Sequence, residues 1–164
     1  KIVVMPKGNA VQAVLYDKTK GMVFDMGSKG KLNSGMESFL ELYGIKELKG
    51  AFIESEQYYT ITKYNEQMTI RPDRFYINGE PDNDSELPFI TGTQLDWNGV
   101  KIEALEGGYK ITNEGSVVTI EKGSVTINGR NLDTTDEEYP LMIDMKNSQI
   151  RRTDYGFAYG FGSW

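Results

Sequence analysis

The stretch Val11-Gln12-Ala13-Val14-Leu15-Tyr16 is a clear strand signal, because its apolar and β-branched residues are typical of a strand. The polar segment Asp17-Lys18-Thr19-Lys20-Gly21 follows it and predicts a hairpin loop. Met22-Val23-Phe24-Asp25 is then the return strand. These segments predict an antiparallel hairpin near the start of the chain, and the elements on either side of it determine the class of the fold.

A shorter apolar run, Val3-Val4-Met5, precedes the hairpin and is predicted to be a strand that ends at the turn cluster Pro6-Lys7-Gly8-Asn9. The chain begins directly on this run at Lys1 and has no initiator methionine. This start predicts that a preceding segment of the protein is missing from the sequence.

A helix is predicted after the hairpin, where Ser34 and Glu37 have the spacing of a capping box. The apolar residues of this segment share one helical face, which consists of Met36, Phe39, Leu40 and Tyr43. Gly44 has the position of the left-handed residue that ends many helices. A short buried strand is predicted next, at Ala51-Phe52-Ile53. The order strand, hairpin, helix, strand predicts an α/β (α+β) fold with one crossover helix.

The rest of the chain has mainly β signals. Strands are predicted at Thr69-Ile70-Arg71 and at Arg74-Phe75-Tyr76-Ile77, while residues 54–68 fit a helix or a strand. After Pro88, strand-like runs are separated by short glycine-containing turns, and they cover residues 93–97, 100–105, 109–111, 116–120 and 124–127. Another strand is predicted at residues 141–145. The aromatic and glycine-rich tail, residues 155–164, predicts an edge strand, with a ligand or membrane-surface platform as the alternative.

Composition excludes several classes of chemistry. The chain has 164 residues, with 38% apolar and 26% charged residues, which suits one folded domain. It contains no cysteine and no histidine. Disulfides, thiol nucleophiles, histidine-based triads and imidazole-held metal ions are therefore absent. We expect no cofactor and no metal.

The net charge of the chain limits the kinds of partner that it can bind. The formal charge is −6 at pH 7, so the chain repels polyphosphate at long range, and nucleic acid is disfavoured as a partner. The sequence has no apolar run of the roughly 18 residues that span a bilayer. The lack of cysteine is compatible with a bacterial, extracytoplasmic setting.

The first half of the chain resembles a known family. Residues 3–15, followed by Gly21-Met22-Val23-Phe24-Asp25-Met26-Gly27, are similar to the opening of the metallo-β-lactamase-like domain of ComEC-type competence proteins. Gly44-Ile45-Lys46-Glu47-Leu48-Lys49-Gly50-Ala51-Phe52-Ile53 resembles that family's next link and buried strand. The resemblance implies an αββα sandwich, here truncated or reduced, in which Asp25 supports the loop beside the metal centre.

The family's metal-binding residues are missing at the corresponding positions. In the family, histidines and an aspartate after the buried strand hold zinc, which activates a water molecule. In this chain the histidine positions hold Ser55, Gln57 and Thr60, and the aspartate position holds Tyr59. Further on, Arg130 falls near the place of a metal-bridging aspartate, where a cation opposes binding of a divalent ion.

The resemblance covers residues 3–130 of a single predicted domain, 1–164, and residues 131–164 form a poorly matched C-terminal extension. It implies a pseudoenzyme related to DNA uptake, with a scaffolding or binding role. The partner would be a separate protein or a membrane-embedded portion of the same polypeptide, and the location extracytoplasmic or membrane-associated.

Two other functions stay open. The tyrosines and the aromatic tail favour a secreted β-rich binding module that is unrelated to this family. A hydrolase that uses carboxylates alone would need Asp25, Glu54, Glu56 and Asp96 to form an oxygen-only metal site. For Asp25 itself, the alternative to a functional role is a strand-end aspartate that caps the backbone amides after it.

Overall fold

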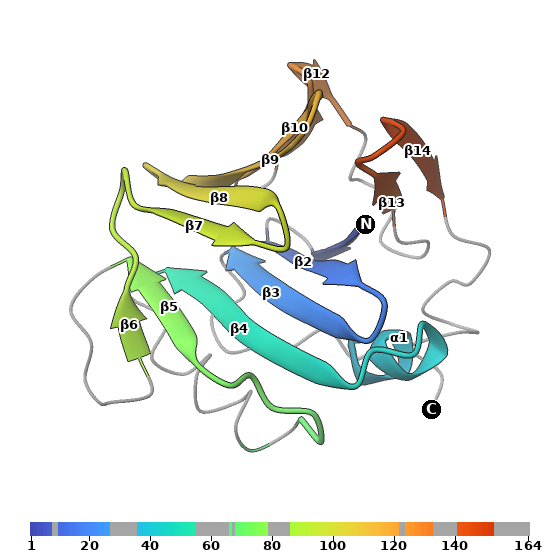
Figure 1. The fold of residues 1–164 in the computed structure, drawn as a ribbon, viewed down its shortest axis with the longest axis vertical. Coiled ribbons are helices and arrows are strands. Elements are labelled where there is room, and N and C mark those ends of the chain that lie inside the picture. Colours follow the sequence, from blue (N-terminus) through green and yellow to red (C-terminus); the bar gives the residue numbers. More distant parts are fainter. Residues whose placement is uncertain are drawn as a thin grey trace.

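The computed structural model describes residues 1–7, 10–26, 36–54, 66, 68–78, 86–121, 124–132 and 141–152. These residues form fourteen strands and one helix, arranged as two sheets that pack face to face (Figure 1). Within the described residues, no helix is long and apolar enough to cross a membrane.

The larger sheet, which we call sheet A, has eight strands. Their order is β14 (Gln149–Arg152), β13 (Leu141–Asp144), β1 (Ile2–Lys7), β2 (Ala10–Asp17), β3 (Lys20–Met26), β4 (Glu47–Glu54), β5 (Phe75–Asn78) and β6 (Glu86–Pro88). Neighbours from β14 to β3 are antiparallel, whereas neighbours from β3 to β6 are parallel. The predicted hairpin is confirmed as β2 and β3, with Val14 opposite Val23.

The smaller sheet, sheet B, is an antiparallel meander. Its order is β12 (Arg130–Asn131), β11 (Ser124–Ile127), β10 (Ser116–Glu121), β9 (Gly108–Asn113), β8 (Val100–Leu105) and β7 (Gln94–Trp97). Two of its turns, Asn98-Gly99 and Asn128-Gly129, have positive φ at both residues. That geometry matches the right-handed twist of the strands and favours Asn-Gly. The strands predicted between residues 93 and 127 are confirmed.

An aromatic ladder forms the core between the two sheets. Phe52 of β4 stacks on Phe24 of β3 and on Tyr76 of β5, with ring centroids 4.7 Å apart in both pairs. Tyr109 of β9 meets Phe52 edge-on from sheet B at 5.4 Å. Phe24, Phe52 and Tyr76 lie at matching positions of neighbouring parallel strands, so the register of sheet A itself builds this stack.

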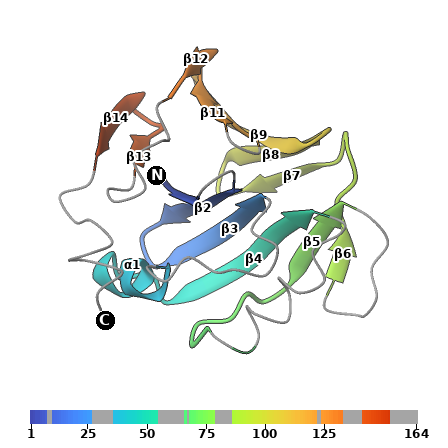
Figure 2. The ribbon, with the colours of Figure 1, turned by 180° about the vertical axis from the view of Figure 1, so that it is seen from behind.

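The helix, α1 (Met36–Leu42), packs on the other face of sheet A (Figures 1 and 2). Its apolar face is confirmed, because Met36, Phe39 and Leu40 are fully buried. The end at Gly44 is confirmed too. Gly44 has φ +72° and donates its N–H to Glu41, and the next N–H reaches back to Leu40, which is a Schellman motif.

The predicted α/β αββα sandwich is wrong, because the described chain is β-rich. Sheet B has turns too short to hold crossover helices. Most of its outward-facing side chains are polar or charged, including Glu103, Lys110 and Thr119, and in the described residues no helix covers them. A second helical layer needs an apolar face to bury, and these residues do not supply one.

Smaller differences concern strand ends. Pro6 was predicted in a turn but lies within β1, opposite Val11. The strand predicted at Thr69-Ile70-Arg71 is wrong, since these residues form no strand. β6, β12 and β14 were not predicted. The predicted capping residue Ser34 and the tail, residues 155–164, lie outside the described residues.

Candidate functional site

A cleft of about 320 Å³ opens at one end of the sandwich, where residues of both sheets meet. We call it the inter-sheet cleft. Its lining combines aromatic and aliphatic residues with amides and both signs of charge, and consists of Lys1, Leu15, Tyr16, Asp17, Trp97, Asn98, Val100, Asn113, Asp144, Met145 and Lys146. Its volume is at the lower end of the range of small-molecule sites, about 300–1,000 Å³.

Four strand ends position these residues. Tyr16 and Asp17 end β2, and Asp144 ends β13, both in sheet A. From sheet B come the turn between β7 and β8, with Trp97 and Asn98, and the end of β9. The cleft therefore exists only when the two sheets are packed together.

One wall of the cleft is fixed by hydrogen bonds between the sheets. Ser116 at the start of β10 is buried, and its Oγ donates to the carbonyl oxygen of Met145 at 2.5 Å. The same hydroxyl contacts the Ser148 hydroxyl. The nitrogen of Lys1 donates to the carbonyl oxygen of Tyr16 at 2.8 Å, which joins β1 to the end of β2. The two contacts of Ser116 hold the turn after β13 against sheet B, whereas the Lys1 bond lies within sheet A.

Neighbouring groups keep the Asp144 side chain, at the cleft, ionised. Burial opposes ionisation of Asp144, but hydrogen bonds from Asn147 and Lys146 and the positive charge of Lys1 outweigh it and lower the pKa of Asp144. Asp144 is consequently a carboxylate at neutral pH.

Tyr16 responds to burial in the opposite direction. Desolvation raises its pKa to about 12, and the neighbouring Tyr43 adds to the shift. The Tyr16 hydroxyl donates to the sulfur of Met142 at 3.7 Å, and its ring meets Phe39 edge-on at 5.9 Å. Tyr16 thus stays neutral and links the rim of the cleft to the helix side of sheet A.

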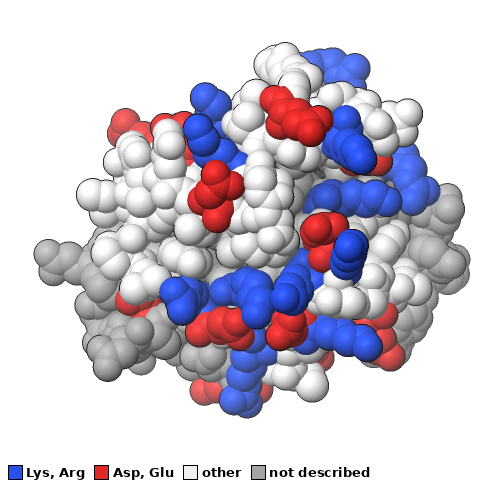
Figure 3. Space-filling model, viewed as in Figure 1, with Lys and Arg blue, Asp and Glu red and all other residues white. Residues whose placement is uncertain are grey.

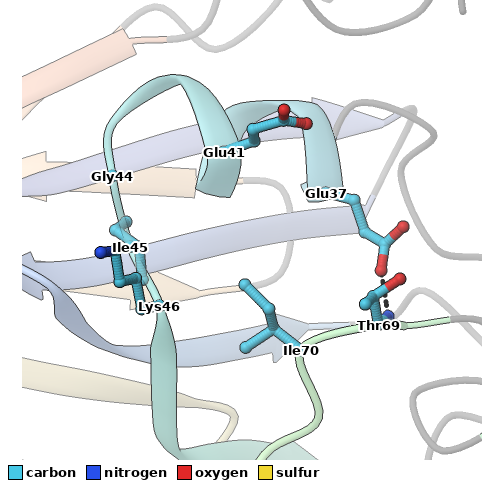
Figure 4. Close-up of a pocket in the computed structure, with 7 residues that line it drawn as sticks. All are labelled: Glu37, Glu41, Gly44, Ile45, Lys46, Thr69 and Ile70. Atoms are coloured by element: carbon cyan, nitrogen blue, oxygen red, sulfur yellow. Dashed lines mark hydrogen bonds between the residues drawn. The ribbon is translucent and has the colours of Figure 1, made fainter.

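A second hollow, the α1 groove, has a volume of about 360 Å³ and is drawn in Figure 4. It lies between α1 and the chain segment just before β5, and its lining is Glu37, Glu41, Gly44, Ile45, Lys46, Thr69 and Ile70. A carboxylate oxygen of Glu37 accepts a hydrogen bond from the backbone N–H of Thr69, as the dashed line in Figure 4 marks. Glu37 is therefore already used to hold the groove together.

Asp25 is fully buried near the end of β3, beside Gln12 of β2. The Gln12 side-chain amide donates to an Asp25 carboxylate oxygen at 3.0 Å. Side chains alternate along a strand, so Asp25 shares with Val23 the face of sheet A on which α1 packs. This buried pair lies on the opposite face of sheet A from the aromatic core.

The other predicted site positions are not brought together with Asp25 in the described residues. Ser55, Gln57, Tyr59 and Thr60 lie outside these residues. Arg130 is exposed on β12 at the edge of sheet B, opposite Ile127. The predicted roles of these positions stay predictions.

The carboxylates that an oxygen-only metal site would need are separated. Asp25 is buried in sheet A, whereas Asp96 is exposed on β7 of sheet B. Glu56 lies outside the described residues, and nothing is described of the Glu54 side chain. Within the described residues, no group of three or more acidic side chains is placed to hold a metal ion.

Charged residues are mixed over the face shown in Figure 3, where Lys and Arg side chains alternate with Asp and Glu. Lys49 illustrates this mixing, because its ammonium lies 3.6 Å from carboxylate oxygens of both Glu47 and Asp73. Exposed pairs of this kind add little stability. They do, however, prevent a continuous basic surface on this face.

Comparison of the chain with protein-family models, with curated proteins and with solved structures found no match in any of the three. The resemblance to ComEC-type domains therefore stays a prediction from the sequence.

Sequence reasoning missed the inter-sheet cleft. Its lining comes from five separate segments, and none of them carries a motif of its own. One signal was present, namely Trp97 next to an Asn-Gly turn, because a large aromatic residue at a strand end is seldom fully buried. That signal identifies a single residue and cannot show what faces it.

Proposed function

We propose that this chain is a non-catalytic, β-rich binding module and that the inter-sheet cleft is its ligand site. The observation that carries the proposal is the cleft itself. It joins an indole, two side-chain amides and charges of both signs at the mouth of a packed sandwich. A concave site with apolar walls and a few polar groups is the usual form of a small-molecule binding site.

The packing of the cleft supports this function. Ser116 ties sheet B to the turn after β13, and Asn98 lies in a turn whose geometry is fixed by two positive φ angles. Residues held in this way lose little conformational freedom when a ligand binds, so more of the contact energy becomes affinity.

The chemistry of the lining favours binding over catalysis. The chain has no histidine or cysteine, so a general base would have to be a carboxylate or an amine. Asp144, the carboxylate with hydrogen bonds from its own turn, has a lowered pKa, which makes it a weaker base. The separation of Asp25 from Asp96 argues against the hydrolase that uses carboxylates alone.

A ligand-observed and protein-observed NMR screen with a library of small fragments tests the proposal. We expect fragments to shift the indole N–H signal of Trp97 and the amide signals of Asn98, Asn113 and Lys146 together. Glu41→Ala, in the α1 groove, is the matched control and should leave these shifts unchanged. Fragments that perturb only the α1 groove, or no site at all, would refute the proposal.

A further inference from the structure

We propose that the ligand of the inter-sheet cleft is a neutral saccharide, an inference that rests on the proposed function. The structure places one indole and two side-chain amides around a single hollow, with balanced charges at its rim. Each of these features matches one property of a sugar ring.

The first feature is Trp97. It is half-buried at the end of β7, packs against the core between the sheets and lines the cleft. The face of an indole is apolar and electron-rich. It packs well against the face of a pyranose, where C–H groups point outward, and it needs no charge on the ligand.

The second feature is the pair of amides, Asn98 and Asn113. Asn98 lies in the turn between β7 and β8, Asn113 is the last residue of β9, and both line the cleft. Each side-chain amide offers two N–H donors and an oxygen acceptor in one plane. Neighbouring hydroxyl groups of a sugar are donors and acceptors at once, so an amide can bind them in pairs.

The third feature is the charge at the rim. The side chains that carry charge are Lys1, Asp17, Asp144 and Lys146, two of each sign. A charged ligand would be attracted by one pair and repelled by the other, whereas hydroxyl groups can hydrogen-bond to all four. This balance favours a neutral polar ligand over an anion or a cation.

The α1 groove lacks this combination. Among the described residues that line it there is no aromatic residue and no side-chain amide, and two are glutamates. Saccharide binding is therefore expected at the inter-sheet cleft and not at the α1 groove.

Tryptophan fluorescence provides the test. The chain has two tryptophans, so Trp164→Phe makes Trp97 the sole reporter. The variant is titrated with four neutral disaccharides, namely cellobiose, maltose, lactose and chitobiose. We expect at least one of them to change the Trp97 fluorescence to a saturating value, with a dissociation constant of about 1 mM or below. The same titration by calorimetry gives a second reading that does not depend on tryptophan.

Matched variants locate the binding. Asn98→Gly removes the amide but keeps the turn, because glycine accepts the φ of 52° found there. We expect it to weaken saccharide binding about tenfold by calorimetry, and Trp97→Ala to weaken it by about that factor or more. Asn128→Gly makes the same backbone change in the equivalent turn between β11 and β12, where φ is 50°. It also removes the hydrogen bond that the Asn128 side-chain oxygen accepts from the Val117 N–H, but it lies outside the cleft lining and should leave binding unchanged.

Other results would overturn the inference. If fragments shift the Trp97 signal but none of the disaccharides binds, the cleft remains a ligand site and the saccharide is wrong. Binding of free amino acids in place of the disaccharides would point to a zwitterionic ligand. Saccharide binding that survives both Asn98→Gly and Trp97→Ala would put the sugar elsewhere on the molecule.

Discussion

The two sheets of this molecule are assembled by different rules. In sheet B every strand pairs with the strand next to it in the sequence, from β7 to β12. In sheet A, β1 pairs with β13 from the far end of the chain, and β3 to β6 run parallel, so each of those pairs needs a longer connection. Sheet B is held together locally, whereas sheet A depends on contacts that form only when the whole chain has folded.

This difference between the sheets predicts which contacts contribute most to the stability of the fold. A meander gains its hydrogen bonds with little loop-closure entropy, while the non-local pairs of sheet A must overcome a larger entropic cost. The aromatic ladder of Phe24, Phe52 and Tyr76 supplies buried area across three of the parallel strands, β3, β4 and β5. We therefore expect the largest losses of stability from changes to sheet A's core.

The largest effect is expected for Phe52→Ala. Phe52 is fully buried and stacks on two rings of sheet A, so its removal leaves a cavity and should lower the free energy of unfolding by about 3–5 kcal/mol. Urea denaturation measures the loss. Leu42→Ala, at a side chain that is 46% exposed, is the control and should change stability by less than about 0.5 kcal/mol. A loss of similar size in both variants would contradict the importance of the ladder.

Gly108→Ala tests the tight packing of sheet B. A Cβ at Gly108 would lie 2.5 Å from the carbonyl oxygen of Ile120, so the strands must separate, at a cost of about 1–3 kcal/mol. Gly115→Ala is the matched control, because no atom lies within 4 Å of its Cβ position. Equal melting temperatures for the two variants would show that β9 and β10 are not as close as described.

Ser116→Ala removes the hydrogen bond between the two sheets. It leaves the Met145 carbonyl oxygen without this donor, and the expected loss is about 1–2 kcal/mol in thermal or chemical unfolding. Ser124→Ala changes the same residue type at a half-exposed position of β11 and should be nearly neutral. Because the bond holds a wall of the cleft, Ser116→Ala should also weaken ligand binding, and unaltered binding would argue against that role.

The smallest effect concerns the pH dependence of Tyr16. Its pKa rises from an ordinary value of 10.0 to about 12 in the folded protein, so the folded state holds the phenol proton more tightly than the unfolded state. The stability from this burial is complete below pH 10.0 and is lost as the pH rises through about 12. Tyr16→Phe should flatten the decline of unfolding free energy over this range. An unchanged slope would mean that Tyr16 is not the group responsible.

The same difference between the sheets explains what could be read from the sequence. Sheet B was predicted almost strand by strand, because Asn-Gly turns such as Asn98-Gly99 are local signals of a hairpin. The hairpin of β2 and β3 and the end of α1 at Gly44 were also predicted, again from neighbouring residues. The pairing of Ile2 with Ile143 was beyond sequence reasoning, since no local pattern encodes a contact across the length of the chain.

The error in the fold class has a similar origin. One well-marked helix suggested an α/β architecture, but most of the described chain lies in the two sheets. The polar side chains on the outward face of sheet B, such as Lys110 and Thr119, were a signal against a helical layer there, and no helix of the described residues covers this face. The inter-sheet cleft was missed because its residues meet only through the packing of both sheets.

A crystal structure of the protein soaked with the fragments that bind in solution tests the central claim most directly. We predict electron density for the ligand between Trp97, Asn98 and Asn113, against the ends of β2 and β13. Density confined to the α1 groove beside Glu41 and Ile70, with the inter-sheet cleft filled only by water, would contradict it.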